Sequence, residues 1–337
     1  MTMQRLLVLG LLFLSLGCRA ATSPPPAPSA EPLAFERVFP RDGIEVLDQI
    51  PPLSAAEAAS WVAPHDLVLG VVVGEEARAY PVDLLARHEV ANDTLGGEPI
   101  VVTFCPLCNS GIVASRLVET DDGPQTLSFG LSGDVLDEAL VLYDRETESL
   151  WPQSRAQAVS GPLSGTVLSL VASQQMPWSE WLATYPDSTV LIPPDATIHP
   201  PTFALPEVGA TAEPPFSPTA HGYVIGVANN NGTAIAFPLE TIAEARLINA
   251  RLDGTALLVV AGDDIGEAWL WRSPAQGDEI ALDDDGLLRD SATGTAWDGA
   301  TGRVVAGEGQ ALQSVAGRLM HWQAWWDWYP QSEVWER

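Results

Sequence analysis

The two halves of this chain resemble each other in a collinear way, and this self-similarity limits the possible folds more than any other feature. The segment Ala-Arg-Ala-Tyr-Pro-Val at 77–82 returns as Ala-Ile-Ala-Phe-Pro-Leu at 234–239. The last segments agree at a constant offset of 144, in the pairs Trp178 and Trp322, Trp181 and Trp325, Tyr185 and Tyr329, and Pro186 and Pro330. Matches that keep their order along the chain predict two tandem copies of one structural module.

The expected domain organisation follows from this repeat. Module one is expected at 34–192 and module two at 223–337, with a linker at 193–222 between them. The linker is rich in proline, threonine and alanine, a composition typical of irregular connections.

Short strands and short helices are expected within each module. The apolar, β-branched run 67–73 ends in a Gly-Glu-Glu turn, so together with 78–80 it predicts a β-hairpin. The segment 83–89 has helical spacing, 100–104 has the composition of a buried strand, and 178–184 places two tryptophans on one helical face. The expected fold class is therefore mainly β with short helices (α+β), in two tandem copies of one β-rich module.

The first residues have the pattern of a bacterial lipoprotein signal. Arg5 supplies a positive charge, and the apolar stretch 6–16 is too short to span a bilayer as a mature helix. The run Ser-Leu-Gly-Cys, which ends at Cys18, is similar to the lipobox whose cysteine becomes the lipidated N-terminus. We therefore expect a signal peptide at 1–17, lipidation of Cys18, and a flexible lipoprotein tether at 18–33.

This pattern places the protein outside the cytoplasm. With the lipid it is anchored to the bacterial cell envelope, in the periplasm or at the cell surface, and plain secretion after cleavage near Ala20 and Ala21 is the alternative. The net charge of −28 argues against nucleic acid or an anionic membrane surface as a partner. The expected membrane contact is the lipid anchor alone, and the sequence assigns no protein partner.

Chemistry is expected at the two cysteines other than Cys18. Cys105 and Cys108 belong to a Cys-Pro-Leu-Cys run, whereas module two has Gly-Asp-Asp-Ile-Gly at the same place, in 262–266. The second copy reads strand, turn, strand, so we expect the cysteines on a turn between two strands. Because the thiols occur in one copy only, module two is interpreted as a degenerate copy that lacks the site.

The first hypothesis for this site is a thiophilic metal ion, copper before zinc. A Cys-x-x-Cys turn can bring two thiolates to one metal, and a single histidine beside them leaves an open coordination position. The predicted ligands are Cys105, Cys108 and His88, since the hairpin and helix before His88 lead directly into the cysteine strand. The residues expected to orient them are Glu89, Asn92, Asn109 and Ser110.

Two alternatives stay open at this point. In one, the same cysteines act without metal as a thiol–disulfide oxidoreductase, although the residues after Cys108 are poor helix formers and a thioredoxin-type site needs a helix there. In the other, a structural disulfide closes the turn of a non-catalytic binding or scaffold module. The sequence leaves it undecided whether the protein is an enzyme.

Several motifs in fixed order resemble one known family. They are Ala-Arg-Ala-Tyr-Pro (77–81), His-Glu-Val-Ala-Asn-Asp (88–93), Cys-Pro-Leu-Cys-Asn-Ser (105–110), Phe-Gly-Leu-Ser-Gly (129–133), Tyr-Asp-Arg-Glu-Thr-Glu-Ser-Leu-Trp (143–151) and Trp-x-x-Trp (178–181). Together they are similar to the bacterial and archaeal family known as domain of unknown function 3179. The resemblance covers nearly the whole mature chain and implies that the His-Glu and Cys-x-x-Cys segments belong to the family pattern. It implies no particular reaction.

Overall fold

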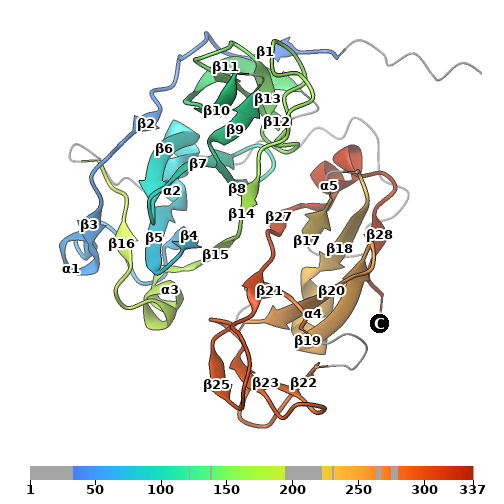
Figure 1. Ribbon diagram of the computed structural model, residues 1–337. Coiled ribbons are helices and arrows are strands. Elements are labelled where there is room, and N and C mark those ends of the chain that lie inside the picture. Colours follow the sequence, from blue (N-terminus) through green and yellow to red (C-terminus); the bar gives the residue numbers. More distant parts are fainter. Residues whose placement is uncertain are drawn as a thin grey trace, which may run out of the picture. The chain divides into compact units, whose positions relative to one another are not determined.

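The computed structural model describes residues 33–336, except 121, 137–138, 194–221, 230, 263–266 and 275–279. The described residues from Phe35 onward belong to one compact unit, and they form many short strands with short helices between them (Figure 1). The prediction of a mainly β fold with short helices is therefore confirmed. The predicted signal peptide, the lipidated Cys18, nearly all of the tether and most of the linker lie outside the described residues.

A β-hairpin begins the first sheet of the N-terminal half, as predicted. Its strands are β4 (Leu67–Val73) and β5 (Glu76–Pro81), which pair antiparallel. Gly74 at the turn has a φ of +61°, a left-handed conformation that glycine adopts without a steric penalty. Helix α2 (Val82–His88) follows Pro81 directly and buries Leu85, which confirms the predicted helix with each boundary moved by one residue. The other strands of this sheet are β3 (Leu53–Ser54), β15 (Ser173–Pro177) and β16 (Thr189–Val190), in the order β15-β4-β5-β16-β3.

The cysteines belong to a second five-stranded sheet, named the cysteine sheet below. Its strands are β2 (Leu47–Asp48), β6 (Val90–Leu95), β7 (Glu98–Cys105), β8 (Ser110–Ser115) and β14 (Leu170–Val171), in the order β14-β8-β7-β6-β2. Strand β7 is buried from Ile100 to Cys105, as its apolar composition predicts. Strand β7 lies between β6 and β8 at the centre of this sheet, and its last residue, Cys105, pairs with Ser110 of β8.

A third sheet and a ribbon complete this half. The sheet has the order β1-β11-β12-β13, with strands β1 (Glu36–Arg37), β11 (Phe129–Leu136), β12 (Ala139–Asp144) and β13 (Leu150–Pro152). The ribbon pairs β9 (Leu117–Thr120) with β10 (Gly123–Thr126). Two further helices are α1 (Ala55–Ala58) and α3 (Trp178–Thr184), and α3 has the bounds that the sequence predicts.

Three four-stranded sheets form the C-terminal half, coloured orange to red in Figure 1. The first has the order β27-β17-β18-β28, with β17 (Tyr223–Ala228), β18 (Ala234–Pro238), β27 (Arg318–His321) and β28 (Glu333–Val334). The second has the order β19-β20-β21-β26, with β19 (Leu247–Leu252), β20 (Thr255–Ala261), β21 (Ala268–Arg272) and β26 (Gln313–Ser314). The third joins β22 (Ile280–Leu282), β23 (Leu287–Asp290), β24 (Ala296–Asp298) and β25 (Val304–Ala306), and the helices are α4 (Leu239–Ala245) and α5 (Trp322–Trp328).

The two halves use the same elements in the same order. The series β4, β5, α2, β6, β7, β8 has its counterpart in β17, β18, α4, β19, β20, β21, and the series β15, α3, β16 in β27, α5, β28. These correspondences agree with the residue pairs that the sequence aligns. The tandem duplication itself, with its module boundaries, stays a prediction.

The repeated tryptophans lie in the core, as predicted. Trp181 of α3 covers Gly70 of β4 so closely that a Cβ on this glycine would lie 2.3 Å from Cε3 of the indole. Trp325 of α5 covers Gly226 of β17 in the same way, at 2.2 Å from Cζ3. Each indole also donates a hydrogen bond to a serine, Trp181 to Ser188 at 2.8 Å and Trp325 to Ser332 at 2.9 Å. A glycine is required at both strand positions because only a hydrogen leaves room for the ring.

Within the described part of the chain, the helices are too short and too polar to cross a lipid bilayer.

Candidate thiol site

The two cysteines lie at a tight turn between paired strands, which confirms the predicted strand–turn–strand arrangement. Cys105 is the last residue of β7 and pairs with Ser110, the first residue of β8, and Cys108 lies on the turn between them. The structure has no disulfide here: both cysteines are free thiols, both are buried, and the two Sγ atoms are 2.7 Å apart. Only a small movement separates this arrangement from the bond length of about 2.05 Å in a disulfide.

The pKa of the Cys105 thiol is lowered by its hydrogen bonds. Burial by itself raises the pKa of the Cys105 thiol, and the negative charge of Glu89 raises it further. Hydrogen bonds from the Cys108 thiol and from the backbone at Leu140 and Cys108 act in the opposite direction and outweigh both effects, so the pKa of Cys105 is below its ordinary value. Hydrogen bonds to a thiolate favour the charged form. The Cys108 thiol therefore donates to a sulfur that is readily ionised.

Glu89 is fixed next to the cysteine strand by its backbone. It ends helix α2 with a φ of 57°, its amide bonds to the carbonyl of Leu85, and its own carbonyl accepts a hydrogen bond of 2.9 Å from Phe104. Only 8% of the residue is exposed, and Oε2 has no hydrogen-bond partner among the described residues. Burial raises the pKa of Glu89 to about 7, because an unpaired carboxylate is poorly solvated there.

Three more buried polar atoms in this region have no partner among the described residues. They are Oγ of Ser110, Oε1 of Gln153 and Oγ of Ser154. Gln153 is tied to the site by two hydrogen bonds, from its side-chain nitrogen to the carbonyl of Ser110 and from its amide to the carbonyl of Leu140. Buried polar groups are nearly always hydrogen-bonded, so these atoms are available to a water molecule or to a polar group of a ligand.

Sequence reasoning missed Gln153, Ser154 and the backbone of Leu140. All three come from β12 or the residues that follow β13, more than 30 positions from the cysteines in sequence. The family motif 143–151 ends just before Gln153, and this proximity was the only available signal.

His88 does not join the thiols in the described structure. Its Nδ1 atom lies 2.7 Å from the carbonyl oxygen of Glu45, which occupies one ring nitrogen. Among the residues that the structure describes, no group of three or more His, Cys, Asp and Glu side chains is arranged to hold a metal ion. The predicted ligand set of Cys105, Cys108 and His88 is therefore not assembled as a set.

The spacing of the sulfurs also differs from that of a metal site. Two thiolates at about 2.3 Å from a tetrahedral zinc ion lie about 3.8 Å apart, whereas these two sulfurs lie 2.7 Å apart. Binding one metal ion with both thiolates would require the turn to open.

The residues that were predicted to orient the ligands make different contacts in the structure. Asn92 is structural: its side chain bonds to Asp48 and to both the amide and the carbonyl of Phe129. Asn109 closes the cysteine turn with a φ of 48°, and its Nδ2 lies 3.5 Å from the hydroxyl of Tyr223. Ser110 pairs with Cys105 across the strands, and the charge of Glu89 acts on the Cys105 thiol; each of the two side chains has an oxygen without a partner among the described residues.

The turn of the C-terminal half that corresponds to the cysteine turn is held by a hydrogen bond from an arginine. Arg246, which has a φ of 63° at the end of α4, corresponds to Glu89. Its guanidinium donates to the carbonyl of Gly262, at the beginning of the turn that corresponds to the cysteines. The carboxyl of Glu267 also lies at Gly262, so this turn has both a cation and a carboxyl beside it.

Comparison with known proteins gives a family and no closer relative. No curated protein and no solved structure matches the chain. One family, described as "Protein of unknown function (DUF3179)", matches residues 41–332 and so covers the cysteine turn, Glu89 and the elements of both halves. The chain therefore belongs to the DUF3179 family of proteins of unknown function.

Proposed function

We propose that this protein is a thiol–disulfide oxidoreductase in which Cys105 and Cys108 exchange electrons with a substrate disulfide and Glu89 accepts the proton. The observation that carries the proposal is the buried, unpartnered carboxyl of Glu89 beside a thiol pair, with a pKa of about 7. A general base works best when its pKa lies near the pH of operation. A disulfide that only stabilises a loop does not need a carboxyl whose pKa lies near the pH of operation.

The proposed reaction follows thiol–disulfide exchange. When the turn opens and exposes the buried Cys105, its thiolate attacks one sulfur of the substrate disulfide, the substrate S–S bond breaks, and one substrate thiolate leaves. Cys108 passes its proton to the carboxylate of Glu89 and attacks Sγ of Cys105 in the mixed disulfide. The Cys105–Cys108 bond forms, the second substrate thiolate leaves, and two electrons have passed from the protein to the substrate.

The short separation of the sulfurs supports this chemistry. At 2.7 Å, the second thiol lies beside the sulfur that it must attack. The oxygens of Ser110 and Gln153 that have no partner among the described residues can form hydrogen bonds with polar groups of a substrate, or with a water molecule that carries its proton.

Metal binding is the second candidate function, because the backbone hydrogen bonds to Cys105 resemble those that hold thiolates in metal-binding turns. Copper, before zinc, would be held by Cys105 and Cys108 after the turn opened, with His88 as a third ligand after it left the carbonyl of Glu45. A structural disulfide in a non-catalytic scaffold is the third candidate.

A redox titration of the full-length protein tests the first candidate. The reduced protein is equilibrated with graded ratios of reduced and oxidised glutathione, and mass spectrometry of the peptide that contains both cysteines gives the oxidised fraction. We expect a reversible Cys105–Cys108 disulfide with a reduction potential above about −300 mV, the upper range for structural disulfides. A lower potential would favour the scaffold.

The variant Cys108→Ser sharpens this test, because serine keeps a hydrogen-bond donor next to Cys105. We expect it to accumulate a mixed disulfide between Cys105 and glutathione, which the wild type resolves. A variant that stays unmodified would contradict the role of Cys105 as the attacking thiol.

We also propose that the protein acts outside the cytoplasm on a lipid anchor at Cys18. The support is the lipoprotein signal pattern at 1–17. Metabolic labelling with a radioactive fatty acid tests it: the label should appear in the wild type and be absent from Cys18→Ser.

A further inference from the structure

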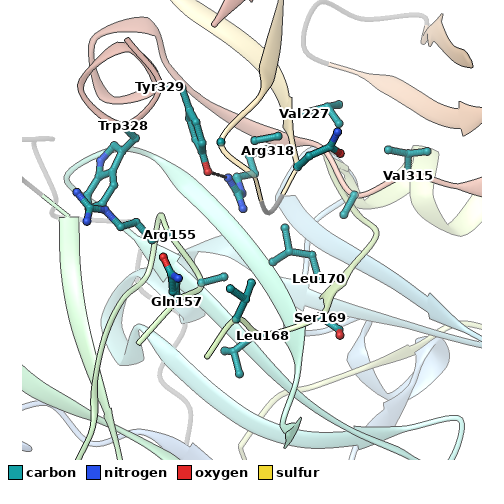
Figure 2. Close-up of a pocket in the computed structure, with 16 residues that line it drawn as sticks. Arg155, Gln157, Leu168, Ser169, Leu170, Val227, Val315, Arg318, Trp328 and Tyr329 are labelled. Atoms are coloured by element: carbon teal, nitrogen blue, oxygen red, sulfur yellow. Dashed lines mark hydrogen bonds between the residues drawn. The ribbon is translucent and has the colours of Figure 1, made fainter. Parts of the chain in front are cut away.

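A cavity of about 480 Å³ lies away from the thiols, between the segment 155–170 and elements of the C-terminal half. Figure 2 shows Arg155, Gln157 and Leu168 on one side, and Arg318 and Tyr329 on the other. The volume is in the range of small-molecule binding sites. The cavity is not needed for the thiol chemistry.

The charge of this cavity is opposite to that of the chain. The sequence has 44 acidic residues and 16 Lys and Arg. The described residues that line the cavity nevertheless include two arginines, Arg155 and Arg318, and no Asp or Glu. A cationic cavity in an acidic protein concentrates small anions by its local potential.

Arg318 is the stronger indication of a ligand. Only 5% of the residue is exposed, its guanidinium donates to the hydroxyl of Tyr329, and its Nε atom has no hydrogen-bond partner in the described part of the chain. The described residues supply no carboxylate to this guanidinium. A buried charge without a counter-charge is strongly unfavourable, so an anion is required to complete the site.

The walls indicate what kind of anion fits. Leu168, Leu170, Val227 and Val315 present aliphatic side chains, and the guanidinium of Arg155 stacks on Trp328 at 4.4 Å from the ring centroid. A guanidinium fork matches the two oxygens of a carboxylate. We infer that the cavity binds a small organic carboxylate, whose charged group bonds to Arg318 and whose apolar body contacts the aliphatic side chains.

Isothermal titration calorimetry on the full-length protein tests this site with benzoate, isovalerate and succinate as probes. We expect at least one of them to bind, and benzamide, the neutral counterpart of benzoate, to bind at least tenfold more weakly than benzoate if benzoate is the ligand. Binding of inorganic phosphate without binding of any of the three carboxylates would overturn the assignment to a carboxylate. Binding of none of the probes would overturn the site.

Variants separate the site from the fold. Arg318→Met should weaken carboxylate binding at least tenfold, the order expected when a charge-assisted hydrogen bond is lost. Arg318→Lys should restore part of the binding because it keeps the positive charge without the forked guanidinium.

Arg155→Met, at a half-buried position, should also weaken binding, and it provides a second test if Arg318→Met does not fold. Arg251→Met, at an exposed arginine of β19, is the control and should bind as the wild type does. Unchanged binding in Arg155→Met together with unchanged binding in the folded Arg318→Met or Arg318→Lys would overturn the inference.

Discussion

The carbonyl oxygen of Glu89 accepts a hydrogen bond of 2.9 Å from the backbone amide of Phe104, the residue that precedes Cys105. This bond joins the end of α2 to the end of β7, so the backbone of Glu89 is fixed opposite the residue that precedes Cys105. The carboxyl itself stays unpartnered at Oε2. A group that is fixed in position and free to take a proton is suited to general base catalysis.

Glu89→Gln should slow the resolution of a mixed disulfide. The amide keeps the shape of the carboxyl but cannot accept the proton of Cys108, and loss of a general base costs about 10²–10⁴ in rate. Quenched-flow mass spectrometry after addition of oxidised glutathione would show the mixed disulfide accumulating. Glu98→Gln, at the exposed beginning of β7, is the control. Equal resolution rates in both variants would remove Glu89 from the mechanism.

The same substitution should make the Cys105 thiol more acidic. The charge of Glu89 raises the pKa of Cys105 in the wild type, so its removal should lower that pKa further. The pH dependence of the thiolate ultraviolet absorbance measures this change. A pKa that stays constant or rises would show that the two groups do not interact.

Stability should depend on pH through Glu89. Burial raises the pKa of its carboxyl from 4.5 to about 7, so the folded protein holds this proton more tightly than the unfolded chain does. Its contribution to stability is complete below pH 4.5 and is lost as the pH rises through about 7. Glu89→Gln removes this loss. Denaturant unfolding should show that the free energy of unfolding of the variant, relative to that of the wild type, increases by up to about 3 kcal/mol between pH 5 and 8. A constant difference over this range would contradict the buried, unpaired state of the carboxyl.

Ser110→Ala should affect activity more than stability. Oγ of Ser110 is buried without a partner among the described residues, so its removal should leave the free energy of unfolding unchanged or raise it by about 1 kcal/mol. Ser149→Ala is the matched comparison, because Oγ of Ser149 accepts from the amide of Leu163 at 2.9 Å. Its loss should cost about 1–2 kcal/mol. Urea unfolding and the glutathione exchange rate measure the two effects. A Ser110→Ala variant with full exchange activity would place the hydroxyl outside the site.

Gly70→Ala should destabilise the fold without touching the thiols. The new Cβ would lie 2.3 Å from the Trp181 indole, a distance at which the ring or the strand must move. Overpacking of this kind costs about 1–3 kcal/mol. Gly309→Ala is the control, since its Cβ would come no closer to another atom than 3.2 Å, at the Thr295 methyl. Thermal unfolding compares them, and equal melting temperatures would mean that the indole does not fill this space.

Sequence patterns predicted what depends on neighbouring residues. The β-branched run before Gly74 predicted the hairpin, and the tryptophan spacing in 178–184 predicted the helix and its buried face. The strand–turn–strand pattern placed Cys105 and Cys108 on their turn. Each of these features is decided within about ten residues, by hydrophobic periodicity and by the backbone freedom of glycine.

The surroundings of the thiols were decided by distant segments. The position of His88 beside the carbonyl of Glu45 depends on where the chain before β2 runs, and the sequence does not show this. The elevated pKa of Glu89 exists because packing buries the carboxyl without a partner, and the unpaired Arg318 is similarly a product of several elements that meet.

The sequence alone therefore determined the strands, the turn and the identity of the two thiols, since local periodicity and turn residues encode them. Only the tertiary structure decided that Glu89 is buried with an oxygen that has no partner among the described residues, and that His88 bonds to the carbonyl of Glu45. The physical reason is that solvation and hydrogen bonding of a side chain are set by all the segments around it, most of which are remote in the chain.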